Sequence, residues 1–241
     1  MRALHSRHGR ERLRCAAVIV AAGTGQRMQG VDKIMTELAG EPVIVHTVRA
    51  FEKSPCIDEI VVVARRDQVE TMENLLREQG FSKVKAVVPG GDTRVGSVRN
   101  GLSAVSRTVE LAAIQDGARP LVTEAIIART VERAGQCHAA APAVPVKDTI
   151  KVADRQGKVL STPDRASLRA VQTPQVFRRE LLLAAWEKAQ QEGKSHTDDC
   201  GAMEALGVPV YLTEGSEENL KITTQLDLYL AEYILKRRNM P

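Results

Sequence analysis

The segment from Cys15 to Lys33 restricts the fold of this chain more than any other stretch. It opens as a short apolar run, Ala16 to Ala22, and continues into a loop with two glycines and two cations. A run of this length is typical of a buried strand. Glycines allow backbone N–H groups to approach a ligand, while Arg and Lys supply fixed positive charge. The segment therefore predicts a strand that ends in a polyphosphate-binding loop.

The loop matches neither of the two common phosphate-binding templates. A P-loop requires Lys where Val31 stands, and the dinucleotide fingerprint requires Gly where Met28 stands. An ordinary turn after a strand is the alternative interpretation. The presence of both Arg27 and Lys33 favours a phosphate site, because a plain turn needs neither cation.

Short apolar runs alternate with amphipathic stretches along the rest of the chain. Aromatic residues make up only 3% of the sequence, so the core is built from aliphatic side chains, which favours parallel strands covered by helices. The predicted strands are 16–20, 59–64, 84–88, 111–115, 139–146 and 208–212. The predicted helices are 42–53, 67–79, 94–106, 123–135, 178–191 and 198–206, with a last one after Thr224. This order predicts one α/β domain with a mainly parallel, twisted, doubly wound sheet and helices on both faces.

The last helix begins with a capping-box pattern, Thr224 followed three residues later by Asp227. Apolar residues recur along it at helical spacing, which predicts that this face packs on the sheet. These residues are Leu226, Tyr229, Leu230 and Tyr233.

Residues 147–170 depart from the alternation. Two short runs with strand-like alternation, 149–153 and 158–161, flank a turn at 155–157. The hairpin is too polar for a core position and predicts a protruding β-arm. An isolated two-stranded arm is marginally stable, so we expect it to pack on another subunit.

The formal net charge of +4 originates in the N-terminal tail. Residues 1–14 hold five Arg and one Glu, and the remainder of the chain is neutral. We expect 1–14 to be a disordered Arg-rich tail, 15–241 to be the domain, and no nucleic-acid partner. No apolar run is long enough for a membrane span, so no membrane partner is expected. Four scattered cysteines without a C-x-x-C pair argue against zinc and disulfides and favour a cytoplasmic location.

Two further segments carry candidate ligand contacts. Gly90 and Gly91 permit close backbone approach after a strand, Asp92 is a candidate helix cap and Ser97 a candidate ligand contact. An ordinary strand–turn–helix joint is the alternative. In the second segment, Asp116 lies at the tip of an apolar strand, the usual place for a Mg²⁺ ligand in nucleotide enzymes.

Arg119 follows Asp116 closely and can grip a phosphate. The segment from His196 to Cys200 matches no zinc pattern. It is better explained by Thr197 as a helix cap, with Asp198 and Asp199 in the first helical turn.

Taken in order, the motifs resemble those of the 2-C-methyl-D-erythritol 4-phosphate cytidylyltransferase family. They are AAGTGQRM, DK, GGDTRVGSV, QDGARP, PVKDTIK, DR, AVQTPQ, TDD and EGSEENLKIT. The resemblance extends from about residue 15 to the end. It implies a Rossmann-like nucleotidyltransferase fold, CTP and 2-C-methyl-D-erythritol 4-phosphate as substrates, Mg²⁺ as cofactor, and a homodimer joined through the β-arm.

The resemblance also assigns roles to residues that match its motifs. Arg27 and Lys33 resemble the pair that stabilises the transition state, while Arg165 and Lys221 orient the attacking phosphate. The implied nucleotide contacts are Ala21, Ala22, Gly23, Gly25, Gly91, Asp92, Ser97 and Asp116, with Asp116 also the metal ligand. The implied acceptor contacts are Arg119, Thr149, Arg165, Thr173 and Lys221.

The expected reaction is attack of the acceptor phosphate on the α-phosphorus of CTP, with pyrophosphate as the leaving group. The product would be 4-diphosphocytidyl-2-C-methyl-D-erythritol, an intermediate of non-mevalonate isoprenoid biosynthesis. A sister activity on ribitol 5-phosphate or another polyol phosphate is the alternative, because the acceptor pocket and not the phosphate loop separates the two.

Overall fold

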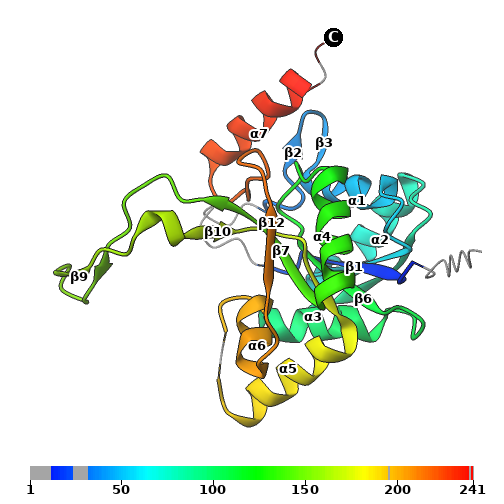
Figure 1. Cartoon of the computed structure of the whole chain (residues 1–241). Helices are drawn as coiled ribbons and strands as arrows, with labels where there is room; N and C mark the ends of the chain where they lie inside the picture. The colour runs from blue at the N-terminus through cyan, green and yellow to red at the C-terminus, as the bar shows by residue number, and fades with distance from the viewer. Residues whose placement is uncertain (1–11, 24–31, 195, 239, 241) are drawn as a thin grey trace, which may run out of the picture.

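The computed structural model describes residues 12–23, 32–194, 196–238 and 240. One eight-stranded sheet forms the centre of this part of the chain (Figure 1). Its strands are β1 (Cys15–Val20), β4 (Glu59–Ala64), β5 (Val84–Pro89), β6 (Leu111–Asp116), β7 (Ala139–Pro145), β10 (Arg169–Val171), β11 (Gln175–Arg178) and β12 (Tyr211–Glu214). A small hairpin, β2 (Glu37–Leu38) and β3 (Glu41–Pro42), lies outside the sheet.

The sheet has the strand order β10-β7-β11-β6-β1-β4-β5, with β12 paired to β7. β1 lies between β4 and β6 and is parallel to both. β10 and β11 pair with their neighbours in the antiparallel sense, whereas β5 and β12 pair in parallel. The mainly parallel sheet predicted from the sequence is therefore confirmed.

Helices cover both faces of the sheet, as predicted. They are α1 (Val43–Lys53), α2 (Val69–Glu78), α3 (Arg94–Ser103), α4 (Glu124–Cys137), α5 (Arg179–Gln191), α6 (Asp199–Leu206) and α7 (Gln225–Arg238). No helix in the described part of the chain is long and apolar enough to cross a membrane.

Strand alternation divides the interior into two cores. Ala17 and Ile19 of β1 face one core, which they share with residues of α1, α2 and α4. Ala16 and Val18 face the other, together with residues of α3, α5 and α6. Because successive side chains of a strand point to opposite faces, a strand buried on both faces is mostly apolar, as β1 is over its whole length and β4 is from Ile60 onward.

Most predicted strand limits lie within one residue of those in the structure, and β4 spans the predicted residues. β12 is an exception, since it begins at Tyr211 and not at Val208. The N–H of Val208 instead donates to the carbonyl of Met203, 3.0 Å away, and so closes the end of α6.

β10 and β11 were not predicted from the sequence. β11 has only four residues between Pro174 and α5, too few for alternation to be recognised. Its residues Val176 and Phe177 are fully buried. A strand this short is defined by its neighbours β6 and β7, not by its own pattern.

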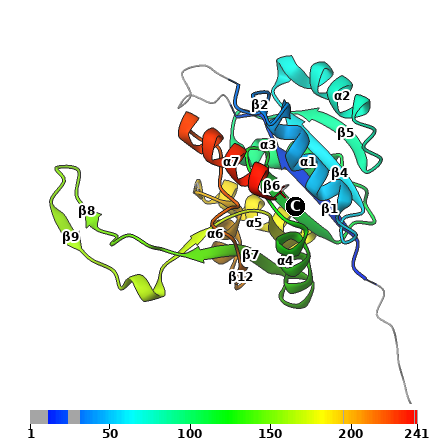
Figure 2. The ribbon, with the colours of Figure 1, turned by 90° about the horizontal axis from the view of Figure 1, so that it is seen from above.

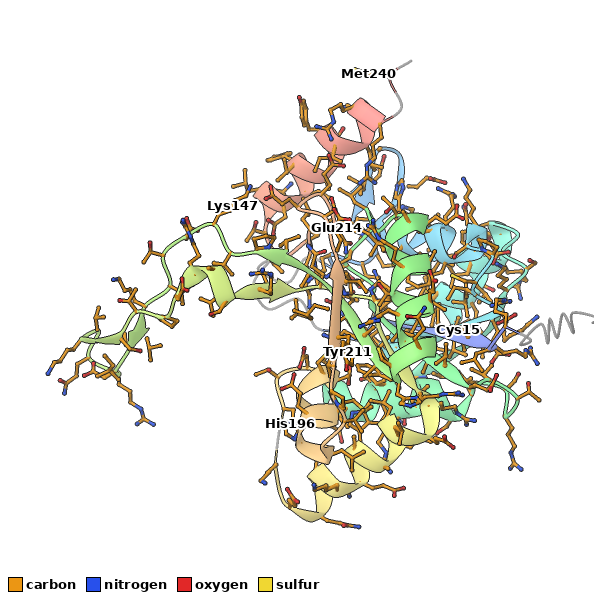
Figure 3. All side chains as sticks on the ribbon, in the orientation of Figure 1. Cys15, Lys147, His196, Tyr211, Glu214 and Met240 are labelled. Atoms are coloured by element: carbon orange, nitrogen blue, oxygen red, sulfur yellow. The ribbon has the colours of Figure 1, made fainter. Side chains whose placement is uncertain are left out.

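The projecting arm is confirmed. β8 (Val152–Ala153) and β9 (Val159–Ser161) form an antiparallel hairpin that stands away from the body in both views (Figures 1 and 2). Gly157, with φ of +85°, supplies the left-handed conformation that the predicted turn needs. Beyond Lys147 the side chains of this segment extend away from the rest of the molecule (Figure 3).

The predicted packing of the last helix is wrong. Leu226, Tyr229, Leu230 and Tyr233 are all exposed, whereas Leu228, Ala231 and Ile234 face the protein. These buried residues pack with the β2–β3 hairpin and the chain around Leu121, in a third small core. Both sets recur at helical spacing, so periodicity alone could not identify the inward face. The capping box is present, because the N–H of Thr224 donates to Asp227 Oδ2 over 2.8 Å.

The expected tail boundary at residue 14 is also shifted. Residues 1–11 lie outside the described residues. Arg12 forms an ion pair of 2.7 Å with Asp58, and the carbonyl of Arg14 accepts from the N–H of Leu111 at 3.0 Å. Leu13 packs against the core. Residues 12–14 therefore belong to the domain and not to a free tail.

We expect Gly101→Ala to destabilise the protein through the contact between α3 and the sheet. An added Cβ would lie 2.4 Å from Val18 Cγ1 and 2.8 Å from Val63 Cγ2. Overpacking of this kind costs about 1–3 kcal/mol, more than the helix propensity that Ala gains over Gly. Urea unfolding should show the loss. The control is Ser103→Ala on the exposed face of the same helix, and equal stability of the two variants would contradict the prediction.

Candidate functional site

The predicted site residues gather where the carboxyl ends of several parallel strands meet. Ala21 follows β1, Gly90 follows β5 and Asp116 ends β6. The connections diverge at β1, since β4 lies on one side of it and β6 on the other. Ligands of open α/β sheets bind at such a switch point, outside the strand ends. The fold thus places the candidate residues in its usual ligand position.

A cavity of about 470 Å³ opens at this edge of the sheet. Its wall contains most of the predicted nucleotide contacts and two of the predicted cations. The lining residues are Val20, Ala21, Ala22, Gly23, Lys33, Ile34, Gly91, Asp92, Thr93, Arg94, Ser97, Asp116, Gly117, Ala118 and Lys221. Two other predicted site residues, Gly25 and Arg27, lie outside the described residues.

The loop between β5 and α3 folds tightly against β1. A Cβ at Gly90 would lie 2.4 Å from the Cβ of Ala22, and one at Gly91 would lie 2.9 Å from the backbone of Gly96. Ser97 Oγ accepts a hydrogen bond of 3.2 Å from the N–H of Gly91. The glycines are thus required for close approach, as predicted, and Ser97 supports the loop from inside.

The helix caps beside the cavity differ from the prediction by one residue each. Thr93, not Asp92, caps α3 by accepting from the N–H of Gly96 at 2.9 Å. Asp198, not Thr197, caps α6. The correction leaves Asp92 on the cavity wall, as the nucleotide prediction requires.

Asp116 is the centre of a charged cluster. Its Oδ2 lies 3.0 Å from Lys221 Nζ and 3.3 Å from Arg119 Nε. Its N–H donates to Thr173 Oγ1 over 3.1 Å. Four predicted residues from three distant segments are therefore in direct contact, which the sequence alone could not show.

A buried asparagine holds this cluster together. The carbonyl of Asn219 accepts from Arg119 at 2.7 Å, and its Nδ2 donates to the carbonyl of Thr173 at 3.0 Å. The residue is fully buried. The sequence analysis did not assign Asn219, because an Asn between two loop residues carries no local signal of such a role.

Opposing effects set the pKa of Asp116. Burial opposes its ionisation, but the positive charges of Lys221 and Arg119 outweigh burial and hold its pKa below the usual range. The carboxylate is therefore charged throughout the neutral pH range and suits a role as a cation ligand.

The chemistry of the cavity fits Mg²⁺. No group of three or more His, Cys, Asp or Glu side chains that could hold an ion occurs among the described residues. Magnesium in nucleotide sites takes one or two protein carboxylates and completes its shell with phosphate oxygens and water. Asp116 on the cavity wall is a carboxylate of the kind that such a site uses.

Two predicted acceptor contacts lie on the arm, away from both the cavity and the cluster around Asp116. Thr149 and Arg165 are exposed on the arm, and neither lines the cavity. Arg165 donates to the carbonyl of Lys147 over 2.6 Å within the arm. Within one chain, therefore, the predicted acceptor site is divided between the cavity and the arm.

Arg94 is a cavity residue that the sequence analysis did not assign. It begins α3, lines the cavity and pairs with Asp199 at 2.7 Å. The sequence signal for Arg94 was its position inside the glycine-rich motif GGDTRVGSV. Only the other residues of this motif were assigned as ligand contacts.

Comparisons with known proteins agree with the geometry. The family model described as 2-C-methyl-D-erythritol 4-phosphate cytidylyltransferase matches residues 15–237. The enzyme of that name from Desulforamulus reducens is 49% identical over 225 residues, covering 92% of this chain and 96% of its own. The one from Caldanaerobacter subterraneus is 46% identical over 224 residues, with 92% and 99% covered.

Solved structures show the same similarity. The 4-diphosphocytidyl-2C-methyl-D-erythritol synthase of Anaerococcus prevotii superposes with a TM-score of 0.84 at 31% identity, covering 93% of this chain and 97% of that one. The 2-C-methyl-D-erythritol 4-phosphate cytidylyltransferase of Thermus thermophilus has a TM-score of 0.77 at 31% identity, with 93% and 100% covered.

We expect Asp116→Asn to remove stability in a pH-dependent way. The carboxylate has a lowered pKa in the folded state, so its contribution is complete above the ordinary aspartate pKa of about 3.9 and is lost as pH falls through the lower folded value. At neutral pH the free energy of unfolding of the wild type should exceed that of Asp116→Asn by about 2 kcal/mol. Urea unfolding of both proteins across the pH range measures the difference. A gap that is unchanged in acid would contradict the assignment.

Proposed function

The chain belongs to the 2-C-methyl-D-erythritol 4-phosphate cytidylyltransferase family, and we propose how its cavity performs the cytidylyl transfer from CTP. It is a nucleotidyltransferase of isoprenoid biosynthesis that joins the cytidylyl group of CTP to 2-C-methyl-D-erythritol 4-phosphate and releases pyrophosphate. The observation that carries the mechanism is the cavity at the strand ends, with Lys33, Lys221 and Asp116 in its wall. The alternative acceptor, ribitol 5-phosphate, is not favoured by the family.

The main obstacle to this reaction is electrostatic repulsion. The acceptor phosphate is already an anion at neutral pH, so it needs no general base to become a nucleophile. It must approach a triphosphate that is also strongly negative. Cations fixed in the cavity stabilise the negative charge that develops on the transferring phosphoryl group and the leaving pyrophosphate. This role fits Lys33, and we extend it to Arg27 on the family motif alone.

The packing of the loop supports the assignment of the nucleotide contacts. Close approach of the Gly91 backbone to α3 leaves room for the nucleotide beside Asp92 and Ser97, which line the cavity. Ala21, Ala22 and Gly23 form the adjoining wall at the end of β1. We assign the first group to the cytidine and the second to the triphosphate, together with Gly25 from the family motif.

The acceptor phosphate is assigned to the cluster around Asp116. Lys221 is more than one-third exposed and is the cation of the cluster that lines the cavity. Arg119 and Thr173 are more deeply buried and hold the cluster in place through Asp116. Lys221 orients the attacking phosphate in this proposal.

Asp116 would hold Mg²⁺ when the nucleotide is bound. The ion would supply charge neutralisation for the phosphate groups. The protein contributes an ionised carboxylate that its neighbouring cations keep charged, as the lowered pKa of Asp116 indicates.

We propose a homodimer because of the composition and position of the arm. Val152, Val159 and Leu160 are exposed on it, an unusual number of apolar side chains for a solvated hairpin. Thr149 and Arg165 match acceptor contacts but lie away from the cavity of their own chain. Both observations are accounted for if the arm packs on a second copy and places these residues at its cavity.

A cytoplasmic location is proposed on the state of the cysteines. Cys15, Cys56, Cys137 and Cys200 are all free. Reduced cysteines are typical of the compartment that also supplies nucleoside triphosphates.

The function is tested by measuring the pyrophosphate released from CTP, in the presence of Mg²⁺, with each of a panel of acceptors. We expect turnover with 2-C-methyl-D-erythritol 4-phosphate and little with ribitol 5-phosphate. Lys33→Ala should lower turnover by about 10²-fold or more, because it removes a cation that acts on the transition state. The control is Lys85→Ala, at an exposed lysine outside the cavity. Preferred use of ribitol 5-phosphate would overturn the assignment of the acceptor. Normal turnover by Lys33→Ala would overturn the role assigned to Lys33.

The divided acceptor site is tested by mixing two inactive chains. Arg165→Ala lacks the arm residue, whereas Lys33→Ala lacks the cavity residue. If the arm serves the partner, a mixed dimer has one site in which both residues are intact. Random mixing should restore about one quarter of wild-type activity. Size-exclusion chromatography checks that chains exchange, and exchange without any recovery would show that each chain uses its own arm.

A further inference from the structure

Asp199 is a buried carboxylate that the mechanism above leaves without a role. Its side chain is 1% exposed, and it lies in the first turn of α6. A buried charge is costly unless an opposite charge compensates it. Arg94 provides that charge, with a guanidinium nitrogen 2.7 Å from Asp199 Oδ2.

Arg94 connects this buried carboxylate to the cavity. It is the first residue of α3, about one-third exposed, and it belongs to the cavity wall beside Asp92 and Ser97. Its charge also reaches Asp116, since Arg94 is among the cations that lower the pKa of that carboxyl group. Arg94 is therefore a cation between the loop assigned to cytidine and the cluster assigned to the acceptor.

Asp199 is itself held by the sheet. Its N–H donates to Gln175 Oε1 at 3.2 Å, while Gln175 Nε2 donates to Asp198 Oδ2 at 2.8 Å. Gln175 opens β11, two residues after Thr173, which contacts Asp116. The start of α6, which carries the carboxylate facing Arg94, is thus attached to a residue two positions after Thr173.

We propose that Arg94 binds the CTP nucleotide and that Asp199 is the positioning residue that holds its guanidinium at the cavity wall. An arginine has five N–H donors in a planar fork, so one side can pair with Asp199 while the other meets an anionic or carbonyl oxygen of the nucleotide. A side chain that is already ordered loses less conformational entropy when the ligand binds. The proposal rests on the CTP-dependent function stated above.

The stability of the pair and its role in binding can be separated. Burial raises the pKa of Asp199 and Arg94 opposes that rise, so removal of Arg94 alone leaves an uncompensated buried acid. The double variant Arg94→Gln/Asp199→Asn removes both charges and their mutual dependence. If the pair is purely structural, the double variant should bind CTP like the wild type. If the pair binds the nucleotide, the double variant should bind CTP more weakly.

The experiment is a double-mutant cycle on CTP binding, measured by calorimetric titration with CTP and Mg²⁺. Arg94→Gln should weaken CTP binding by about tenfold or more and lower the melting temperature. Asp199→Asn should weaken binding less. The double variant should regain the melting temperature of the wild type. Its CTP affinity should equal that of Arg94→Gln.

The matched control is Arg49→Gln, which breaks the half-buried ion pair with Glu41 outside the cavity. It should leave CTP binding unchanged. Wild-type CTP affinity in the double variant would show that the pair is only structural. Additive losses from the two single changes would show that Asp199 does not act through Arg94, and either result overturns the proposal.

If a charge-removing variant fails to fold, Arg94→Lys provides the test. It keeps the positive charge beside Asp199 but loses the planar fork, so binding should be weaker than wild type at a near-normal melting temperature. Wild-type binding by Arg94→Lys would overturn the proposal. Failure of the wild type to bind CTP would instead overturn the proposed function, whereas CTP binding without acceptor turnover would affect only the acceptor assignment.

Discussion

The ion cluster around Asp116 is the interaction on which the site depends. The carboxylate ends β6, and its two cations come from the following turn and from the loop before α7. That loop is fastened beside β6 by the N–H of Ile222, which donates to the carbonyl of Ala118 at 2.8 Å. Because the charges neutralise one another, a strand tip buried among polar groups stays stable and ionised.

The parallel sheet explains why this cluster faces a nucleotide-sized cavity. Parallel strands end at one edge, so β1, β5 and β6 bring a small-residue wall, a glycine loop and an acid together. Gly90 and Gly91 of that loop lie where any Cβ would collide with neighbouring backbone or side chains. Arg94 extends the same arrangement to α6 through Asp199. The binding residues in the described part of the cavity are therefore held by the sheet and by helix starts.

The arm gives the protein a different kind of constraint. A two-stranded hairpin has no core of its own, and this one exposes apolar side chains such as Val159 and Leu160. It also carries Thr149 and Arg165, which the family motifs assign to the acceptor site. The proposed dimer would satisfy both needs through one contact, so that assembly and catalysis depend on the same segment.

Sequence patterns were sufficient wherever burial is continuous along a strand or where a motif is local. The limits of β1 and β4, the glycines of the loop after β5, the arm and Asp116 at a strand tip were all predicted, since each follows from neighbouring residues alone. The family resemblance added the substrates, which no spacing could specify.

Only the tertiary structure decided the rest. The last helix has two apolar sets at the same spacing, and packing against Leu121 and the β2–β3 hairpin selected Leu228, Ala231 and Ile234 as the inward face. β11 is a strand because β6 and β7 pair with it. Arg94 and Asp199 are about a hundred residues apart, and no periodicity connects them. Sequence by itself determined which segments could be buried and which loops could approach a phosphate, because those properties are local; which charges meet depends on contacts between distant segments, and those exist only in the folded chain.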